Sequence, residues 1–564
     1  MTDMPNTGWG EIPADAVRIL PLGGLGEIGL NMMAVEYLGE LLLIDCGLMF
    51  PEPYMPGIDL VIPDVSCLEG QTGRIRGLIL THGHEDHIGA VPFLLAKLGF
   101  PTVYGSPLTL GLLRHRLEEH ELLGQASLVE VQPRQALDLG VFHVEVFRVA
   151  HSIVDGLGVA IRTAMGWIVH TGDFKLDQTP VDDQPTDLVR LAAYGEQGVL
   201  LLMSDSTNVE KKGFTLSERE VAAAFAEIVP RAKGMVAVAT FSSNIHRIQQ
   251  VVQEAVRCGR KVAIAGRSMV ANTRIARELG YLDIPDDVLI ELRQARDLPR
   301  HRLLLLTTGS QGEAQSTLVR MAMEEFRALP LEPGDTVILS SKFIPGNEKA
   351  INRLINHLYR RGAEVFYETT SEVHVSGHAS QEELKIVLSL VCPQNFVPVH
   401  GEYRHLVRHA ELARGMGVPA ERVTVLENGC PLVVSAAGLS REPRLETGRV
   451  LVDGRGVGDV GLMELRDRRH IANHGLVVVL LAVSPVDGRI LYGPELLSRG
   501  FVAEEETDIL DLARRQVCDM LAGMAPETAT EQETLEVEVR KCLRRFFNRT
   551  VERRPLILPI ILEQ

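Results

Sequence analysis

The chain has 564 residues, which is too long for a single hydrophobic core, so we expect several domains. Hydrophobic residues make up 45% of it and charged residues 23%, a globular composition that excludes a largely disordered chain. The formal net charge of −17 argues against a protein that wraps nucleic acid with a basic surface, although bound cations or one local groove can still attract phosphate.

Two further features bear on the compartment. The longest apolar run, residues 476–483, is far shorter than the roughly 20 residues that cross a bilayer, and the N-terminus lacks the basic start and apolar run of a secretion signal. The seven cysteines are scattered and form no CxxC pair, which predicts neither a disulfide framework nor a thiolate zinc site. We therefore expect a cytoplasmic protein with no membrane contact.

The first third of the chain has the pattern of a layered α/β core. Residues 17–80 alternate apolar and polar positions between glycine-rich turns, which predicts successive strands. Helical patterns follow at 87–99 and 108–120. Further strands are expected around 141–150, 157–173 and 198–204.

From about residue 216, longer helices alternate with short apolar strands, which predicts a parallel-sheet domain inserted into the first one. The first pattern returns near residue 365, and turns and short strands fill 431–462. In the last segment we expect strands within 476–493 and 555–562 and helices at 503–523 and 526–547. We predict a first domain in two parts, residues 1–210 and 367–440, with an inserted domain at 211–366. A linker at 441–462 leads to a C-terminal domain at 463–564.

The strongest chemical signal is the sequence THGHEDH at 81–87, directly after the apolar run GLIL. Side chains in a tight loop at a strand end can converge, and imidazole and carboxylate groups suit zinc or manganese. We expect metal ligands at His82, His84, Asp86 and His87. Later apolar runs are followed by His151, Asp173 and His400; each alone is more typical of a cap or a satisfied polar group, but their order and context favour metal binding.

This ordered set resembles the metallo-β-lactamase superfamily, in which an HxHxDH loop, a later His, a bridging Asp and a final His hold two metal ions. The resemblance implies an αββα sandwich and two divalent ions, zinc or manganese. One ion would be held by His82, His84 and His151 and the other by Asp86, His87 and His400, with Asp173 between them. Asp45, at the end of LLLID, matches an early Asp that supports the ligand loop from behind.

Three later motifs resemble those of the β-CASP group, which cleaves nucleic acids: SDSTN at 204–208, SGHAS at 376–380 and HGE at 400–402. Members that keep a His in the third motif are directed at RNA, so His400 points to RNA. Within the group, GGLGEIGLN, FSSNIHR, GRSM and HVSGH are similar to the bacterial ribonuclease J family, and the similarity extends through the C-terminal domain. Leu30, Val154 and Gly156 depart from the family pattern, but none of them is a ligand position.

The resemblance implies a ribonuclease that acts as a 5′-to-3′ exonuclease preferring a 5′-monophosphate, and also as an endonuclease, in RNA maturation including rRNA processing and in mRNA decay. Asp86 and His378 would act in catalysis, with Asp205 beside them. RNA phosphates would be held by Ser242, Ser243, Asn244, His374, Val375, Ser376, Gly377 and His378. Implied partners are the RNA substrate, a second copy in a homodimer or further copies in a tetramer, and other RNA-decay proteins.

Some alternatives stay open. GLGEIG at 24–29, with Asp45 downstream, matches a dinucleotide-binding fingerprint, but the following residues predict a strand, turn and strand where that fingerprint needs a helix. A lactonase or thioesterase would keep the metals but leave the insertion unexplained, and a non-enzymatic RNA-binding scaffold would be expected to lack ligands. Gly57, Asp59 and Asp453 match a structural calcium site in some relatives, with solvated acids as the alternative. The basic segment 537–554 is interpreted as a solvated or subunit-facing surface rather than an RNA contact.

Overall fold

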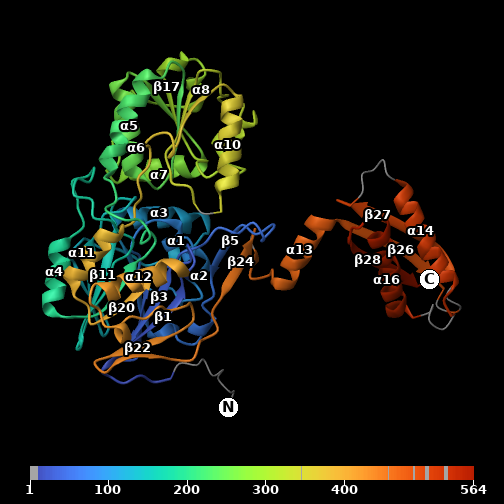
Figure 1. Cartoon of the computed structure of the whole chain (residues 1–564), viewed down its shortest axis with the longest axis horizontal. Coiled ribbons are helices and arrows are strands. Elements are labelled where there is room, and N and C mark those ends of the chain that lie inside the picture. Colours follow the sequence, from blue (N-terminus) through green and yellow to red (C-terminus); the bar gives the residue numbers. More distant parts are fainter. Residues whose placement is uncertain are drawn as a thin grey trace. The chain divides into compact units, whose positions relative to one another are not determined.

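The computed structural model describes residues 10–344, 346–454, 456–484, 486, 489–501, 507–525 and 531–563. The first nine residues and the starts of the helices expected at 503–523 and 526–547 lie outside these described residues. The chain forms two compact units (Figure 1). The first contains Met1–Met49 and Ile62–Arg449, and the second contains Phe50–Val61 and Val450–Gln564.

The first unit is built on two facing sheets. One has the strand order β23-β22-β1-β3-β4-β6-β7-β8 and the other β20-β13-β12-β11-β10-β9. The strands of the first are β1 (Ala16–Gly23), β3 (Met32–Tyr37), β4 (Glu40–Ile44), β6 (Ile75–Ile79), β7 (Val103–Gly105), β8 (Leu128–Glu130), β22 (Leu432–Ser435) and β23 (Gly438–Arg441). Those of the second are β9 (Ala136–Leu139), β10 (Phe142–Arg148), β11 (Leu157–Thr163), β12 (Gly166–His170), β13 (Val199–Asp205) and β20 (Asn395–Val399).

Apolar side chains from the two sheets share one core, which includes Ile19, Val35 and Ile44 on one side and Val159 and Met203 on the other. Helices form the outer layers: α1 (Glu85–Ile88), α2 (Val91–Leu94) and α3 (Pro107–Glu119) belong to the first sheet's side, and α4 (Leu188–Gln197), α11 (Gln381–Val391) and α12 (Tyr403–Gly415) cover the second sheet. This αββα sandwich confirms the predicted fold class.

One local expectation needs correction. The single helix expected at 87–99 is broken into α1 and α2, because Pro92 lacks an N–H for an i−4 bond and therefore sits in the first turn of a new helix. Within 476–493 the structure has one strand over Leu476–Val483 and the start of a second, Ile490–Arg499, as expected. The glycine-rich segment at 23–29 leads into the antiparallel pair β3 and β4, so the helix that a dinucleotide site requires is not there.

The insertion forms a parallel six-stranded sheet in the order β16-β15-β17-β14-β18-β19. Its strands are β14 (Val236–Ala239), β15 (Lys261–Ala265), β16 (Leu289–Ile290), β17 (Leu303–Thr307), β18 (Thr336–Leu339) and β19 (Glu364–Phe366). Helices flank this sheet in Figure 1, namely α5 (Glu218–Arg231), α6 (Ile245–Arg257), α7 (Arg267–Glu278), α8 (Leu292–Ala295), α9 (Thr317–Ala322) and α10 (Glu348–Arg360). Burial on both faces explains why these strands are continuously apolar in sequence.

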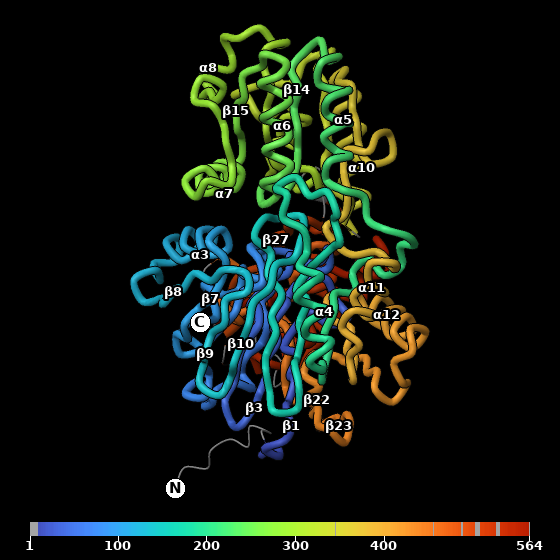
Figure 2. The backbone as a smooth tube through the Cα atoms, turned by 90° about the vertical axis from the view of Figure 1, so that its left-hand side faces the viewer, coloured from blue at the N-terminus to red at the C-terminus, as the bar shows by residue number. Residues whose placement is uncertain are grey.

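The insertion leaves and rejoins the sandwich at neighbouring strands. β13 and β20 pair in parallel, with Asp205 opposite Val399, so the chain segments before and after the insertion end side by side. A second contact lies between α7 and α3, seen in both Figure 1 and Figure 2, where Gly111 faces Ile275 and Leu279. The insertion is therefore held against the sandwich near the ends of the strands that carry the predicted ligands.

The second unit contains a three-stranded sheet in the order β27-β26-β28, formed by Ile490–Arg499, Leu476–Val483 and Leu556–Glu563. Helices α14 (Thr507–Ala522) and α16 (Gln532–Thr550) cover one face through Val517, Val539 and Leu543, and α13 (Leu462–His474) contacts β28. All seven cysteines are free, as the sequence predicts. Among the described helices, none has the length and apolar character needed to span a membrane.

Candidate metal centre

The ligand loop between β6 and α1 is fixed by the buried carboxylate of Asp45. Its Oδ1 accepts the Thr81 N–H at 2.7 Å, and its Oδ2 accepts the Thr81 hydroxyl at 2.9 Å and the His87 Nδ1–H at 2.7 Å. The bond to Nδ1 leaves Nε2 of His87 as the nitrogen available to a metal. This is the supporting position that the sequence predicts for Asp45.

The structure brings all seven predicted ligands together, in two groups. The first group consists of His82, His84 and His151. The Nδ1 of His84 lies 3.0 Å from Nε2 of His82 and 3.3 Å from Nε2 of His151. Three imidazole nitrogens converging on one point form a donor set that fits a zinc or manganese ion.

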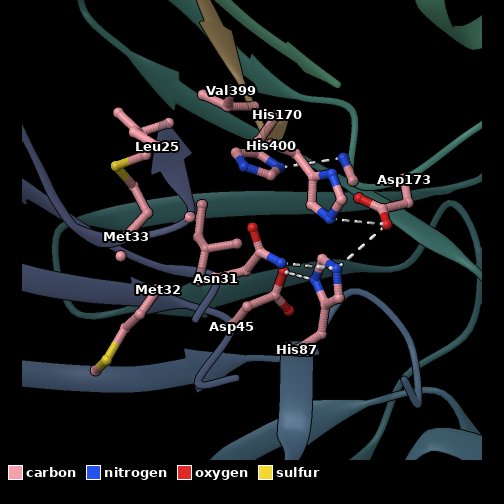
Figure 3. A pocket seen from close by; sticks show the side chains of 14 residues that line it. Leu25, Asn31, Met32, Met33, Asp45, His87, His170, Asp173, Val399 and His400 are labelled. Atoms are coloured by element: carbon pink, nitrogen blue, oxygen red, sulfur yellow. Dashed lines mark hydrogen bonds and ion pairs between the residues drawn. The ribbon is translucent and has the colours of Figure 1, made fainter. Parts of the chain in front are cut away.

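The second group consists of Asp86, His87, Asp173 and His400. Figure 3 shows His87, Asp173 and His400 pointing toward one another. The Nε2 atoms of His87 and His400 lie 3.2 and 3.3 Å from Asp173 Oδ2. Asp86 Oδ2 is 3.4 Å from His400 Nε2 and 3.6 Å from His87 Nε2. This group offers two imidazoles and two carboxylates to a cation.

Asp173 lies between the two groups. Besides its contacts with His87 and His400, its Oδ2 is 3.8 Å from Nε2 of both His82 and His151. Its side chain is almost fully buried and follows β12 through a short turn at Gly172, whose φ of 60° a glycine adopts without strain. One carboxylate oxygen can therefore serve both groups.

Neighbouring residues orient the two histidines that come from distant parts of the chain. The Nδ1–H of His151 donates to the Gly377 carbonyl at 2.8 Å, so the returning chain after the insertion positions a ligand of the first group. His400 Nδ1 lies 2.5 Å from the hydroxyl of Thr207, in the motif that follows β13. Such partners fix both the ring orientation and the nitrogen left for the metal.

Burial dominates the electrostatics of the three-histidine group. It lowers the pKa of His82 and His151 well below the ordinary value, and neighbouring histidines lower them further. Burial likewise lowers the pKa of His84 to about 4. These rings are neutral at physiological pH, which is the form that binds a metal.

Carboxylates dominate the second group. Burial opposes the charged form of His400, but Asp173 and Asp86 outweigh it and raise its pKa to about 9. His87 also has its pKa held well above the ordinary value, because Asp173, Asp45 and Asp86 outweigh burial. Conversely, burial disfavours the Asp173 carboxylate, but His400 and His87 hold its pKa well below the usual range. This half of the centre attracts cations.

His378 and Asp205 form a pair beside the second group. His378 Nδ1–H donates to Asp205 Oδ2 at 2.8 Å, and Asp205 Oδ1 lies 3.6 Å from His400 Nδ1. Burial disfavours the Asp205 carboxylate, but His378 lowers its pKa. The ring of His378 is partly exposed, at 20% of its side-chain surface, and so can reach a substrate.

The predicted RNA-binding residues lie in two places. Ser242, Ser243 and Asn244 precede α6, where Asn244 is buried and caps the helix by accepting the Arg247 N–H at 3.0 Å. Residues 374–378 form the loop that returns from the insertion. His374 is the unusual member of this loop, because neither ring nitrogen has a hydrogen-bond partner in the described part of the chain.

Sequence reasoning missed several residues around this loop. Burial and the charges of Arg247, Lys342 and Lys211 hold the pKa of His374 well below its ordinary value, which shows that cations surround the ring. Lys342 is itself half-buried, and burial together with Lys211 lowers its pKa. Isolated lysines in connecting segments carry no sequence signal, so only the fold could reveal these cationic neighbours of His374.

Tyr281 is a second residue without a sequence signal. Its hydroxyl, in the insertion after α7, donates to the carboxylate of Asp155, which lies in the same loop as the ligand His151. Asp155 is in the left-handed region, with φ of 63°, and is half-buried. This contact ties the insertion to a ligand-bearing loop of the sandwich.

Two of the residues predicted to bind calcium, Gly57 and Asp453, form hydrogen bonds with Arg468. Within the second unit, Arg468 Nη1 donates to the Gly57 carbonyl at 3.1 Å, and its Nη2 bonds Asp453 Oδ2 at 2.6 Å. Asp59 Oδ2 accepts the Gly454 N–H at 2.8 Å. A calcium ion would have to displace this guanidinium, so calcium binding here stays a prediction.

Four family models match the sequence in consecutive regions. They are described as "Metallo-beta-lactamase superfamily", "Ribonuclease J, beta-CASP domain", "Zn-dependent metallo-hydrolase RNA specificity domain" and "Ribonuclease J C-terminal domain", over residues 26–201, 233–358, 364–423 and 463–564. With the sandwich and the buried His and Asp groups, these matches define a metal-dependent hydrolase of the metallo-β-lactamase superfamily. Its third matched region is an RNA-specificity domain.

Curated relatives identify the particular family. Ribonuclease J of Thermus thermophilus is 46% identical over 98% of this chain and 96% of its own length, and ribonuclease J 1 of Streptococcus pyogenes is 41% identical over 97% of both. Ribonuclease J of Mycobacterium tuberculosis is 41% identical over 100% of this chain and 99% of its own. The chain belongs to the ribonuclease J family, and its substrate is RNA rather than the small molecules considered above.

A solved structure supports the fold independently. A protein of unknown function from Enterococcus faecalis aligns with a TM-score of 0.53, covering 74% of this chain and 100% of that one. Its sequence identity of 15% limits the likeness to the fold alone.

Proposed function

We propose that the chain is a ribonuclease with two divalent ions, zinc or manganese, and that it degrades RNA from the 5′ end with preference for a 5′-monophosphate. Internal cleavage, in RNA maturation including rRNA processing and in mRNA decay, belongs to the same proposal. The observation that carries it is the position of Asp173, whose Oδ2 lies within 3.8 Å of ligand nitrogens from both groups. One group would be completed by His82, His84 and His151 and the other by Asp86, His87 and His400.

When bound, such ions neutralise charge that develops on a phosphate and lower the pKa of water. The protein's own contribution is to position the substrate and to move a proton. Because His378 Nδ1 is bonded to Asp205, its Nε2 is the atom left to contact the scissile phosphate or protonate the leaving oxygen. Asp205 holds this ring in place through that hydrogen bond.

His378→Ala tests this assignment. We expect turnover to fall by roughly 10²- to 10⁴-fold, the usual contribution of a general acid, while both ions remain bound. Metal content by mass spectrometry and single-turnover cleavage would be measured together. Loss of an ion from the variant would show that His378 is a metal ligand and would overturn the role proposed for it.

The 374–378 loop and the serines before α6 are proposed to hold RNA phosphates. Backbone N–H groups and hydroxyls bind an anion without net positive charge, which suits a chain of charge −17. His374, with no partner for either ring nitrogen, and the neighbouring Lys342 and Lys211 support this placement. The side chain of Asn244 already caps α6, so Asn244 would support RNA binding by holding the start of that helix in place.

A homodimer is proposed through the C-terminal domain. The face of its sheet opposite the helices exposes Leu558, Ile560 and Leu562 at 46%, 40% and 46%, whereas the alternate residues Ile557 and Ile561 are buried. An apolar stripe of this kind is typical of an interface. Light scattering would measure the mass of the assembly, and we expect Ile560→Asp to reduce it to that of a monomer. The proposed tetramer and contacts with RNA-decay proteins would form from this dimer.

The direction of cleavage is tested with one RNA labelled at its 5′ end and carrying either a monophosphate or a triphosphate there. Metal-stripped protein would be supplied with manganese or zinc. Release of labelled mononucleotide from the monophosphate RNA alone is the expected result. Internal fragments from both RNAs would make the protein chiefly an endonuclease and would overturn the 5′-end preference.

A further inference from the structure

The C-terminal unit contains a cavity of about 420 Å³ whose polar lining is almost entirely cationic. Arg540, Arg544 and Arg545 reach it from α16, Arg554 from the turn before β28, and His470 from α13. Its floor is apolar and includes the buried residues Pro555 and Ile557. The cavity lies wholly within the unit that does not contain the metal centre.

These arginines are not explained by internal pairing. In the described part of the chain, Arg540, Arg544 and Arg545 form no hydrogen bond and no ion pair, whereas most other arginines of α-helices here have a carboxylate or carbonyl partner. Arg554 donates from Nε to Asn548 Oδ1 at 3.0 Å, which directs its guanidinium toward α16 and adds no negative charge. Four guanidinium groups thus share one cavity without a counter-charge among the described residues.

Two ordinary explanations do not account for the cluster. Cations near the end of a helix are favoured by its dipole, but the effect falls off within the last turn, and Arg540 and Arg544 precede the last turn of a helix that ends at Thr550. Like charges four residues apart repel each other, so the arrangement costs stability rather than adding it. The feature is unusual in a chain with a net charge of −17.

We propose that this cavity binds the phosphodiester backbone of RNA. The guanidinium fork matches phosphate oxygens in pairs of hydrogen bonds, and arginine is the usual residue for this task. Positions 540 and 544 are about 6 Å apart along the helix, so the cations form a row that suits consecutive phosphates better than a single ion. The inference deepens the proposed ribonuclease function by adding a contact for RNA outside the metal centre, and it rests on that function.

The test compares two double variants of the full chain that change the net charge equally. R544Q/R545Q removes two cations from the cavity, and R514Q/R515Q removes two exposed cations from α14 in the same unit. Binding of a labelled single-stranded RNA of about 30 nucleotides would be measured by fluorescence anisotropy in EDTA, which prevents cleavage, over a range of salt concentrations. Thermal unfolding and light scattering would check that both variants fold and assemble.

We expect R544Q/R545Q to bind the long RNA roughly tenfold more weakly at 0.1 M salt, with the slope of log affinity against log salt reduced by about 1.4, since each lost phosphate contact on a single strand removes about 0.7. R514Q/R515Q should bind as the unmodified protein does. Inorganic phosphate should compete poorly with the RNA when its concentration equals that of the RNA phosphate groups, because the site is proposed to bind several linked phosphates at once. Equal competition by phosphate would mean a site for a single anion and would overturn the RNA assignment.

Cleavage of an RNA of about four nucleotides separates this inference from the proposed function. Such an RNA should be cut at the same rate by both variants and by the unmodified protein with manganese. Absence of cleavage by all three would reject the proposed function, whereas equal long-RNA affinity in all three would reject the cavity alone. A change in assembly mass with unchanged RNA affinity would assign the arginines to a subunit contact and would also reject it.

Discussion

The two halves of the metal centre are equally buried in the protein but differ in composition, and their histidines have opposite pKa shifts. In the three-histidine half, burial keeps the rings neutral, and the pKa of His84 falls to about 4. In the other half, carboxylates outweigh the same burial, and the pKa of His400 rises to about 9. The number of carboxylates within contact, rather than the degree of burial, sets the protonation state of a buried histidine here.

This difference has a consequence for metal loading. An ion entering the three-histidine half meets ligands that already have the required form, whereas an ion entering the other half must displace protons from His87 and His400. Asp173 belongs to both halves and couples them. Changes in and around the centre can therefore be ordered by whether they affect both halves, one half or only its surroundings.

Asp173→Ala should have the largest effect, because it removes the carboxylate shared by both halves. We expect cleavage to fall by more than the roughly 10- to 100-fold that changes in supporting residues cost, and paired binding of two ions to be lost. Metal content per chain and the single-turnover rate would be measured. Normal activity in this variant would break the idea of a shared ligand.

Gly377→Ala should affect one half alone. A Cβ at this position would lie 2.7 Å from Cε1 and 2.8 Å from Nδ1 of His151, so this ligand must move. We expect weaker binding of one ion, with the Asp86, His87 and His400 half still loaded, and a smaller loss of activity than for Asp173→Ala. Gly124→Ala is the control for the added methyl group, because a Cβ there meets no atom within 4 Å and its φ, like that of Gly377, is not positive. Equal loss of both ions would contradict the separation of the halves.

The protonation difference should appear in the pH dependence of metal binding. His400 has a raised pKa, so its proton competes with the ion below pH 9, and affinity of that half should rise by up to about tenfold per pH unit per proton until about pH 9. The three-histidine half, with lowered pKa values, should bind independently of pH above about 5. Calorimetry at pH 7 in buffers of different ionisation enthalpy counts the released protons. If binding of each ion released the same number of protons, the two halves would not differ in protonation as proposed.

Tyr281→Phe should have the smallest effect, because Tyr281 touches neither half and acts through Asp155. Loss of a hydrogen bond to a carboxylate costs about 1.5–3 kcal/mol, part of which should appear as lower thermal stability. We expect kcat to fall a few-fold with KM and metal content nearly unchanged. Tyr359→Phe, an exposed tyrosine of the insertion, serves as the control. A normal kcat with reduced stability would limit Tyr281 to a structural role.

Much of the architecture could be predicted from sequence, because the spacing of apolar residues indicates which side chains are buried and Gly or Pro residues mark where elements end. Alternating residues before 80 indicated strands with one face in a core, and the change to apolar strands between helices after 216 indicated the parallel sheet. The seven predicted ligands could be placed together because they lie in four segments that each follow an apolar strand, and strand ends meet at one edge of a sheet. The prediction of one helix at 87–99 was wrong, because a proline inside an apolar run can begin a new helix.

The supporting roles that sequence reasoning missed connect positions far apart in the chain. Thr207 supports His400, Gly377 supports His151, and Tyr281 supports the loop after His151. Each is an ordinary residue whose role depends on a partner more than 100 residues away. The opposite pKa shifts of the two halves were equally hidden, because they depend on distances between side chains rather than on their order.

The pairing of β13 with β20 has a consequence during synthesis of the chain. His400 leaves the ribosome roughly 230 residues after Asp173, which takes on the order of 10–45 s at typical elongation rates of about 5–20 residues per second. During that interval six of the seven predicted ligands have been synthesised, while the insertion between β13 and β20 is being completed. A nascent chain thus cannot complete the carboxylate-rich half of its centre, and the messenger RNA from which it is translated is not yet exposed to a finished nuclease on the same ribosome.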